Sequence, residues 1–146
     1  MKKLIKNISD NIKDDLQSYN DFLTDSLDSK VNLINSILKY ITKKKGKQFR
    51  PILCILSARL AGEPNDKTFL SASAVEMLHV ATLLHDDVVD ESFIRRGWPT
   101  VNNIWKSKIA ILIGDYMFSK SLNNISKLDD FEYIKILSNI SQRLSE

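Results

Sequence analysis

Three aspartates at the end of one apolar segment have the residue type and spacing that divalent cations require. Asp86, Asp87 and Asp90 come at the end of a stretch, residues 69–89, that is apolar at nearly every position. On a helix, Asp86 and Asp90 stand four residues apart, so their carboxylates project to the same side about one turn apart. Mg²⁺ favours oxygen ligands and usually completes its coordination shell with phosphate and water. Bound Mg²⁺ ions would therefore explain carboxylates that otherwise repel one another.

The same segment gathers its other polar residues on one side. At about 100° per residue, six polar side chains fall within one stripe: Glu76, His79, Thr82, Asp86, Asp87 and Asp90. Because unpaired buried charges are too costly to persist, metal ions or cationic partners must face this stripe. The alternative is an acidic helix end that pairs with Arg95 and Arg96 across the following loop. The apolar character of the helix and the Arg-Arg-Gly after it favour the metal.

The elements that must position these residues are predicted to be helices. Apolar residues recur at spacings of three and four, which is typical of amphipathic helices. The pattern predicts helices over about residues 4–27, 31–44, 52–61, 66–90, 106–123 and 129–145, with Pro51 in a first helical turn. Residues 91–103, with Gly97 and Pro99, are predicted to be a loop. No strand alternation stands out, so we expect an all-α helical bundle.

Composition narrows the class of protein. The 146 residues fit a single domain, with 43% hydrophobic and 27% charged residues. A net charge of +3 is too small to argue for nucleic acid, and no recognition motif accompanies it. The single cysteine, Cys54, lies in an apolar stretch that indicates core packing. Neither a signal peptide nor an uncharged run long enough to span a bilayer is evident, so we expect a cytoplasmic protein.

Five segments in register resemble the trans-isoprenyl diphosphate synthases, and most closely their long-chain, octaprenyl-type members. The segments are residues 47–51, 76–79, 83–92, 95–97 and 114–116. The resemblance implies the N-terminal part of the isoprenoid synthase fold. It also implies a prenyltransferase that condenses isopentenyl diphosphate with an allylic prenyl diphosphate to make a long-chain polyprenyl diphosphate, with Mg²⁺ as cofactor.

The resemblance assigns roles to individual residues. It implies that Asp86 and Asp90 bind Mg²⁺ bridging to the allylic diphosphate, that Asp87 supports them, and that Arg95 holds the same diphosphate. Residues implied to bind the diphosphate of isopentenyl diphosphate are Lys47, Arg50, His79 and Arg96. Arginine forks suit phosphate oxygens, and metal ions stabilise charge on a departing diphosphate. His85 is interpreted as structural or as a supporting residue.

Each of these residues also has a simpler explanation. His79 could be a core histidine with its hydrogen bonds satisfied, Lys47 could continue the preceding lysine run, and Arg50 could pair with a nearby carboxylate. His85-Asp86 also occurs in metal-dependent phosphohydrolases, but that chemistry needs further histidines from other helices. His79, the second of two histidines, stands on the same predicted helix.

Product length depends on the residues one helical turn before Asp86. Ala81 and Thr82 stand there, and neither is aromatic. Because a growing prenyl chain should extend down the helix from the aspartates, these residues predict an open tunnel, as in the long-chain members.

The chain also departs from the family pattern. Gln48 stands where an arginine is usual, and Lys106 where a glycine is common. The family's second aspartate-rich motif has no counterpart, because Asp129 and Asp130 are better interpreted as an acidic helix start. We therefore expect residues 1–146 to be the N-terminal portion of one truncated domain, with exposed apolar faces on its later helices. Such a chain would be incomplete for catalysis alone and would form a homodimer or pair with a complementing C-terminal chain. The alternative is a non-catalytic fragment or small subunit.

Overall fold

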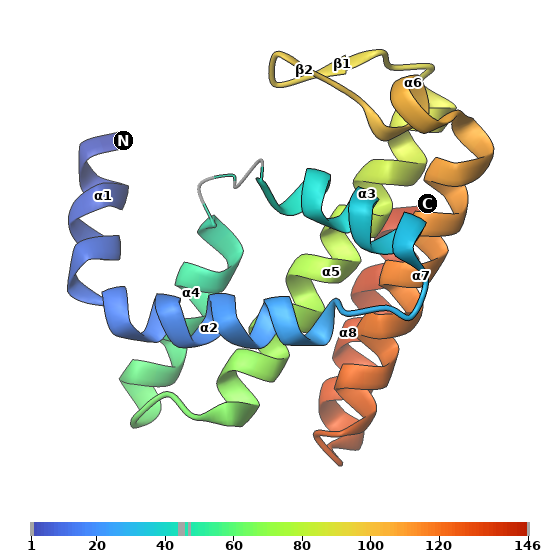
Figure 1. The fold of residues 1–146 in the computed structure, drawn as a ribbon. Helices are drawn as coiled ribbons and strands as arrows, with labels where there is room; N and C mark the ends of the chain where they lie inside the picture. Colours follow the sequence, from blue (N-terminus) through green and yellow to red (C-terminus); the bar gives the residue numbers. More distant parts are fainter. Residues whose placement is uncertain (1, 44–45, 47, 146) are drawn as a thin grey trace.

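Residues 2–43, 46 and 48–145 are described by a computed structural model, and most of them lie in helices (Figure 1). The helices are α1 (Lys2–Asn11), α2 (Lys13–Ser26), α3 (Asn32–Lys43), α4 (Phe49–Ala61), α5 (Asp66–Val89), α6 (Val101–Trp105), α7 (Ser107–Ser126) and α8 (Phe131–Ser145). Two short strands, β1 (Ile94–Arg95) and β2 (Trp98–Pro99), form an antiparallel hairpin. The predicted all-α fold is confirmed.

Helix α5 runs through the middle of the bundle (Figure 1). It packs along α7 on one side and contacts α2 and α4 on the other. Its buried residues supply all three clusters of the core, through Met77 and Ala81, through Phe69 and Ala72, and through Ala74 and Leu78. Because α5 is covered on several sides, it must be apolar around most of its circumference, as its sequence indicates.

Both ends of α5 are well defined. At the start, the Asn65 side chain accepts hydrogen bonds from the backbone N–H groups of Lys67 and Thr68, and the Thr68 hydroxyl accepts one from the Asn65 N–H. Such a capping box contributes about 1 kcal/mol of stability. At the other end, the N–H of Asp90 still bonds to the Asp86 carbonyl at 2.8 Å, and Glu91 then turns to a left-handed φ of 49°. The aspartates therefore occupy the last turn of α5.

Two expectations about the elements were wrong. The helix predicted over residues 4–27 is interrupted at Ile12, whose φ of −121° breaks the helix while its side chain is buried. The loop predicted over residues 91–103 contains the hairpin and α6. Its strands have two residues each, too few for alternation to be seen. Arg96 and Gly97 form the turn with φ values of 53° and 80°, the positive pair that two-residue hairpins favour.

The later helices expose apolar side chains, as predicted. The exposed residues on α7 and α8 are Ile111, Leu112, Phe118, Leu122, Phe131, Ile134, Ile136 and Ile140. Patches of this kind favour association with another surface. Within the described residues, none of the helices combines the length and apolar character needed to cross a bilayer.

Candidate active site

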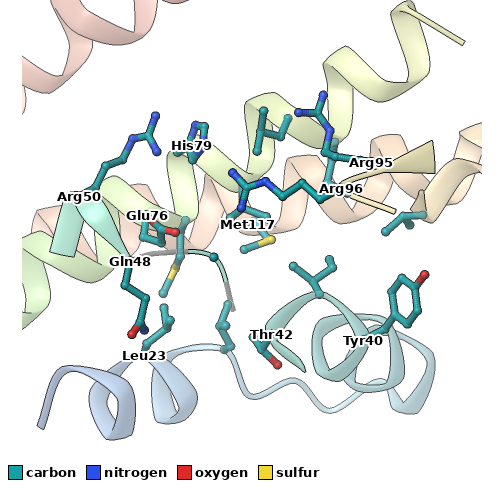
Figure 2. A pocket seen from close by; sticks show the side chains of 18 of the residues that line it. Leu23, Tyr40, Thr42, Gln48, Arg50, Glu76, His79, Arg95, Arg96 and Met117 are labelled. Carbon is teal, nitrogen blue, oxygen red and sulfur yellow. The ribbon is translucent and has the colours of Figure 1, made fainter. Parts of the chain in front are cut away.

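A cleft of about 800 Å³ opens between α2, α3, α4, α5 and the hairpin. Its lining includes Arg50 at the start of α4, His79 on α5, and Arg95 and Arg96 on the hairpin. Figure 2 shows Arg50, His79 and Arg96 directed toward one another around Glu76. The cleft thus brings together four of the side chains that the resemblance assigned to diphosphate binding.

Gly46 leaves room for Arg96 in this cleft. A Cβ added at Gly46 would lie 2.7 Å from Nη1 of Arg96, so the guanidinium rests against the glycine. Nearby, Gln48 begins α4 in the left-handed region with a φ of 46°, and its side-chain amide donates to Oδ1 of Asn20 at 2.8 Å. The Gln48 side chain therefore ties α4 to α2.

Asp87 and Arg95 form an ion pair at the edge of the cleft. Nε of Arg95 donates to Oδ1 of Asp87 at 2.7 Å, and Asp87 is only 5% exposed. The pair holds the hairpin against the last turn of α5. It also confirms one part of the alternative considered above, since an aspartate of the helix end does pair with an arginine across the loop.

Asp86 and Asp90 differ from Asp87. Both are exposed, and neither forms an ion pair with any residue that the structure describes. Two unpaired carboxylates one turn apart form the hard-oxygen donor set that a divalent cation prefers, so these residues fit such an ion. No group of three or more acidic, histidine or cysteine side chains suited to a metal occurs within residues 2–43, 46 and 48–145. The described part of the chain therefore presents a two-carboxylate face.

The imidazole of His79 is neutral at physiological pH. Burial, together with the positive charges of Arg50, Arg96 and Arg95, lowers its pKa from 6.5 to about 4. A neutral imidazole can donate one hydrogen bond to a phosphate oxygen without adding charge. His79 therefore fits the cleft as a hydrogen-bond donor beside the arginines.

A clamp of hydrogen bonds fixes the hairpin to α5. The Thr100 hydroxyl donates to the Ser92 carbonyl at 2.7 Å, and the Asn102 side-chain amide donates to the carbonyls of Ser92 and Asp87 at 3.0 and 3.2 Å. The Ser92 N–H also donates to the Asp87 carbonyl at 2.9 Å. These bonds hold the loop between the aspartates and the two arginines in one position.

His85 sets the spacing between α5 and α7. A Cβ at Gly114 would clash with the His85 ring, so the ring packs directly on the α7 backbone. Its Nε2 lies 3.3 Å from Oδ1 of Asp115 and 3.4 Å from the Ile111 carbonyl. His85 thus fixes the helical turn that carries Asp86, in agreement with its interpretation as structural.

Comparison with known proteins identifies the family. The family model described as "Polyprenyl synthetase" matches residues 31–146, more than half of the chain. The chain belongs to the polyprenyl synthetase family.

The relatives of this polyprenyl synthetase chain include long-chain enzymes. It is 38% identical over 136 residues to the all-trans-nonaprenyl-diphosphate synthase (geranyl-diphosphate specific) of Rhodobacter capsulatus, covering 92% of the chain and 42% of the relative. It is 32% identical over 142 residues to the octaprenyl diphosphate synthase of Escherichia coli, covering 97% and 44%. The chain therefore spans less than half of the length of these relatives.

Solved structures agree with the fold. The decaprenyl diphosphate synthase from Rhodobacter capsulatus superposes with a TM-score of 0.89 at 34% identity, covering 94% of this chain and 43% of the other. A polyprenyl synthase from Caulobacter crescentus, solved with calcium and isoprenyl diphosphate, superposes with a TM-score of 0.88 at 33% identity, covering 94% and 42%. The prediction that the chain has the N-terminal part of the isoprenoid synthase fold is confirmed.

Ala81 and Thr82, like Asp86 and Asp90, are not among the residues that line the cleft. Ala81 is buried in the core among residues such as Met117 of α7, and the Thr82 hydroxyl donates to the His79 carbonyl at 2.8 Å. Their role in product length stays a prediction. Lys47 lies outside the described residues of this polyprenyl synthetase chain.

Several residues that shape the site were not predicted from the sequence. Thr100 and Asn102 clamp the hairpin, and Tyr19 lines the cleft with a buried hydroxyl. Glu76 was placed on the polar stripe but given no role. Asn102 could have been noticed as an amide shortly after the Arg-Arg-Gly turn, whereas Tyr19 gave no signal, because it continues the apolar stripe of its helix.

Proposed function

We propose that this chain forms one wall of the active site of a long-chain polyprenyl diphosphate synthase, which condenses isopentenyl diphosphate with an allylic prenyl diphosphate. The observation that carries the proposal is the convergence of Arg50, Arg96 and the neutral His79 in one cleft beside the aspartate-bearing turn of α5. Arginine forks and a neutral donor suit a diphosphate that must stay intact during the reaction.

The two diphosphates occupy different places in this proposal. The diphosphate of isopentenyl diphosphate binds to Arg50, Arg96 and His79, with Lys47 as a further ligand. The allylic diphosphate lies beyond the rim, toward Asp86, Asp90 and Arg95. The Asp87 carboxylate positions Arg95 through their ion pair.

Mg²⁺ is the proposed cofactor, held by Asp86 and Asp90. When bound, it neutralises the diphosphate that leaves the allylic substrate, which makes that group depart more readily. The residues of the chain orient the two substrates so that the allylic carbon faces the double bond of isopentenyl diphosphate. After the new carbon–carbon bond forms, loss of a proton restores an allylic product.

A second chain or a further portion of polypeptide completes the proposed site. Because the chain spans 42% and 44% of the two relatives named above, the wall facing Asp86 and Asp90 must come from elsewhere. The exposed apolar side chains of α7 and α8 suit such a partner, either a complementing C-terminal chain or a second copy in a homodimer. A cytoplasmic location and the assignment of residues 1–146 to one domain also stay predictions.

A non-catalytic subunit is the second candidate. The absence of an ion pair on Asp86 and Asp90 in the described residues suits metal binding, but binding alone does not require turnover. A chain that stabilises a full-length relative through α7 and α8 would also expose apolar faces. Turnover in the completed complex decides between the two.

The function is tested by complementation. The chain is co-expressed with the portion of Escherichia coli octaprenyl diphosphate synthase that follows the aligned region, and incorporation of labelled isopentenyl diphosphate into allylic primers is measured with Mg²⁺. We expect long-chain products from the pair, and a loss of at least about a hundredfold when Asp86 and Asp90 are both changed to Asn. Asp129→Asn, an exposed aspartate outside the site, is the control. A folded complex that binds both substrates without turnover would favour the non-catalytic subunit.

A further inference from the structure

Glu76 is an acidic residue in a cleft that also presents the guanidinium groups of Arg50, Arg95 and Arg96. It is half-buried on α5, lines the cleft, and lies between Arg50, His79 and Arg96 in Figure 2. It nevertheless forms no ion pair with any residue that the structure describes. A half-buried carboxylate without a partner is costly, so its presence calls for an explanation.

The titratable side chains that line the cleft with Glu76, among the described residues, are Tyr19 on α2, Tyr40 on α3, Arg50 on α4, His79 and Asp87 on α5, and Arg95 and Arg96 on the hairpin. Of these, Arg50 and Arg96 act on the Glu76 carboxylate, and the charge of Glu76 acts on Tyr19. Burial raises the pKa of Glu76, whereas Arg50 and Arg96 act in the opposite direction. In the empty cleft, the two arginines favour the ionised form of the carboxylate and so act against its burial.

The floor of the cleft has a second unsatisfied group. The Tyr19 side chain is fully buried, and its hydroxyl has no hydrogen-bond partner in the described residues. Burial and the charge of Glu76 both raise its pKa, so Tyr19 remains protonated and cannot neutralise an anion. A neutral, protonated Glu76 would no longer raise the pKa of Tyr19 through its charge.

A diphosphate that enters this cleft changes the charges around the Glu76 carboxylate. It takes up the positive charge of Arg50 and Arg96 that had favoured ionised Glu76, and it adds negative charge close to the carboxylate. Burial then raises the pKa of Glu76 with less opposition from the arginines. The carboxylate and the diphosphate, two anions in a confined space, also repel each other. Uptake of one proton from solvent by the carboxylate removes this repulsion.

We propose that Glu76 is the counter-charge of the empty cleft and the proton acceptor of the filled one, so that diphosphate binds together with a proton. In the free protein Glu76 offsets the repulsion among the arginines, and on binding its carboxylate becomes a carboxylic acid. Affinity for diphosphate then rises as pH falls. This inference rests on the proposed function, because it takes the cleft to be the site of isopentenyl diphosphate.

The test measures isopentenyl diphosphate binding to the 146-residue chain by isothermal titration calorimetry. Titrations near pH 7.5 in Tris and in HEPES, whose ionisation enthalpies differ, give the number of protons taken up. Glu76→Gln keeps the shape of the side chain and removes its charge. Glu63→Gln removes an exposed carboxylate from the α4–α5 loop and is the matched control.

We expect Glu76→Gln to bind isopentenyl diphosphate about tenfold tighter than the wild type, because the bound diphosphate no longer faces a carboxylate. It should also take up fewer protons and show a flatter dependence of affinity on pH. Glu63→Gln should behave as the wild type. Because Glu63 does not line the cleft, the difference between Glu76→Gln and Glu63→Gln isolates the removal of the charge inside the cleft.

The possible failures are distinguishable. Weaker binding by a folded Glu76→Gln variant, checked by its thermal melt, would show that the carboxylate positions the arginines, and would overturn the inference. An unchanged proton count would overturn it as well. If the wild type binds no diphosphate, the inference about Glu76 is overturned, while the proposed function is decided separately by turnover in the co-expressed complex.

Discussion

Nε of Arg95 lies 2.7 Å from Oδ1 of Asp87 and donates a hydrogen bond to it, joining the hairpin to the last turn of α5. Asp87 is buried in this contact, while its neighbours Asp86 and Asp90 face outward. The three aspartates therefore have two distinct physical roles. One carboxylate maintains the structure around an arginine, and two remain available for a cation.

Changing Asp87 to Asn should destabilise the chain. The arginine loses its counter-charge, and loss of one partner from a buried charged hydrogen bond costs about 1–3 kcal/mol. Asp86→Asn, on the same helical turn but exposed and unpaired, should leave stability unchanged in the absence of metal. Urea unfolding at neutral pH gives both values, and equal losses in the two variants would contradict the division of roles.

Gly114→Ala should be strongly unfavourable despite alanine's higher helix propensity. Its Cβ would meet the His85 ring, and overpacking of this kind costs about 1–3 kcal/mol. Gly62→Ala, where a Cβ meets nothing within 4 Å, is the control. If the double variant His85→Ala, Gly114→Ala fails to recover stability in thermal melts, the clash is not the cause.

Tyr19→Phe should not reduce stability. Its buried hydroxyl has no partner within the described residues, and an unsatisfied polar group costs about 1–3 kcal/mol. Tyr40→Phe is the contrasting variant, because the Tyr40 hydroxyl donates to the Pro99 carbonyl at 2.7 Å, and it should lose about 1 kcal/mol. A larger loss at Tyr19 than at Tyr40 in chemical denaturation would reveal a partner for the Tyr19 hydroxyl.

Because folding lowers the pKa of His79, the free energy of unfolding should decrease as pH falls. Folding lowers this pKa from 6.5 to about 4, so the unfolded chain binds the proton first as pH falls. The contribution of His79 to stability should therefore be lost progressively between about pH 6.5 and pH 4. The difference between the unfolding curves of the wild type and His79→Gln isolates it, and a difference that does not change with pH would contradict the shifted pKa.

Bound diphosphate should reverse this shift. Its negative charge offsets Arg50 and Arg96, which help to hold the His79 pKa down, so the pKa should rise on binding. An NMR titration of the His79 ring with and without isopentenyl diphosphate measures the change. His85, which contacts Asp115 on α7, serves as the internal reference within the same spectra.

The sequence predicted the structure best where one physical requirement, the burial of apolar side chains, decides the residue type at a position. Apolar spacing predicted the helices, because burial of one face determines which residues can be apolar. The cluster of arginines and His79 was predicted from motifs whose spacing reflects the same fold. Ile12 was missed because the break in the helix depends on how that side chain packs, which helical periodicity does not record.

Contacts between distant residues account for most of what could not be predicted. The pairing of Asp87, rather than Asp86, with Arg95 depends on the angle at which the hairpin leaves α5. Asn102 bonds to backbone carbonyl groups. Because every residue has one, the sequence does not indicate which residues Asn102 contacts. Glu76 was visible on the polar stripe, but its lack of a partner is evident only once Arg50 and Arg96 are placed.

The central position of α5 also has a consequence for synthesis of the chain. Tyr19 of α2 and Ile55 of α4 are fully buried in a cluster that includes Phe69 and Ala72 of α5. A polypeptide leaves the ribosome from its N-terminus. Until α5 has emerged, the apolar faces of α2 and α4 lack the helix that covers them. The apolar faces of α2 and α4 are therefore accessible to chaperones and to non-native partners during translation. They become buried when α5 emerges and packs against them.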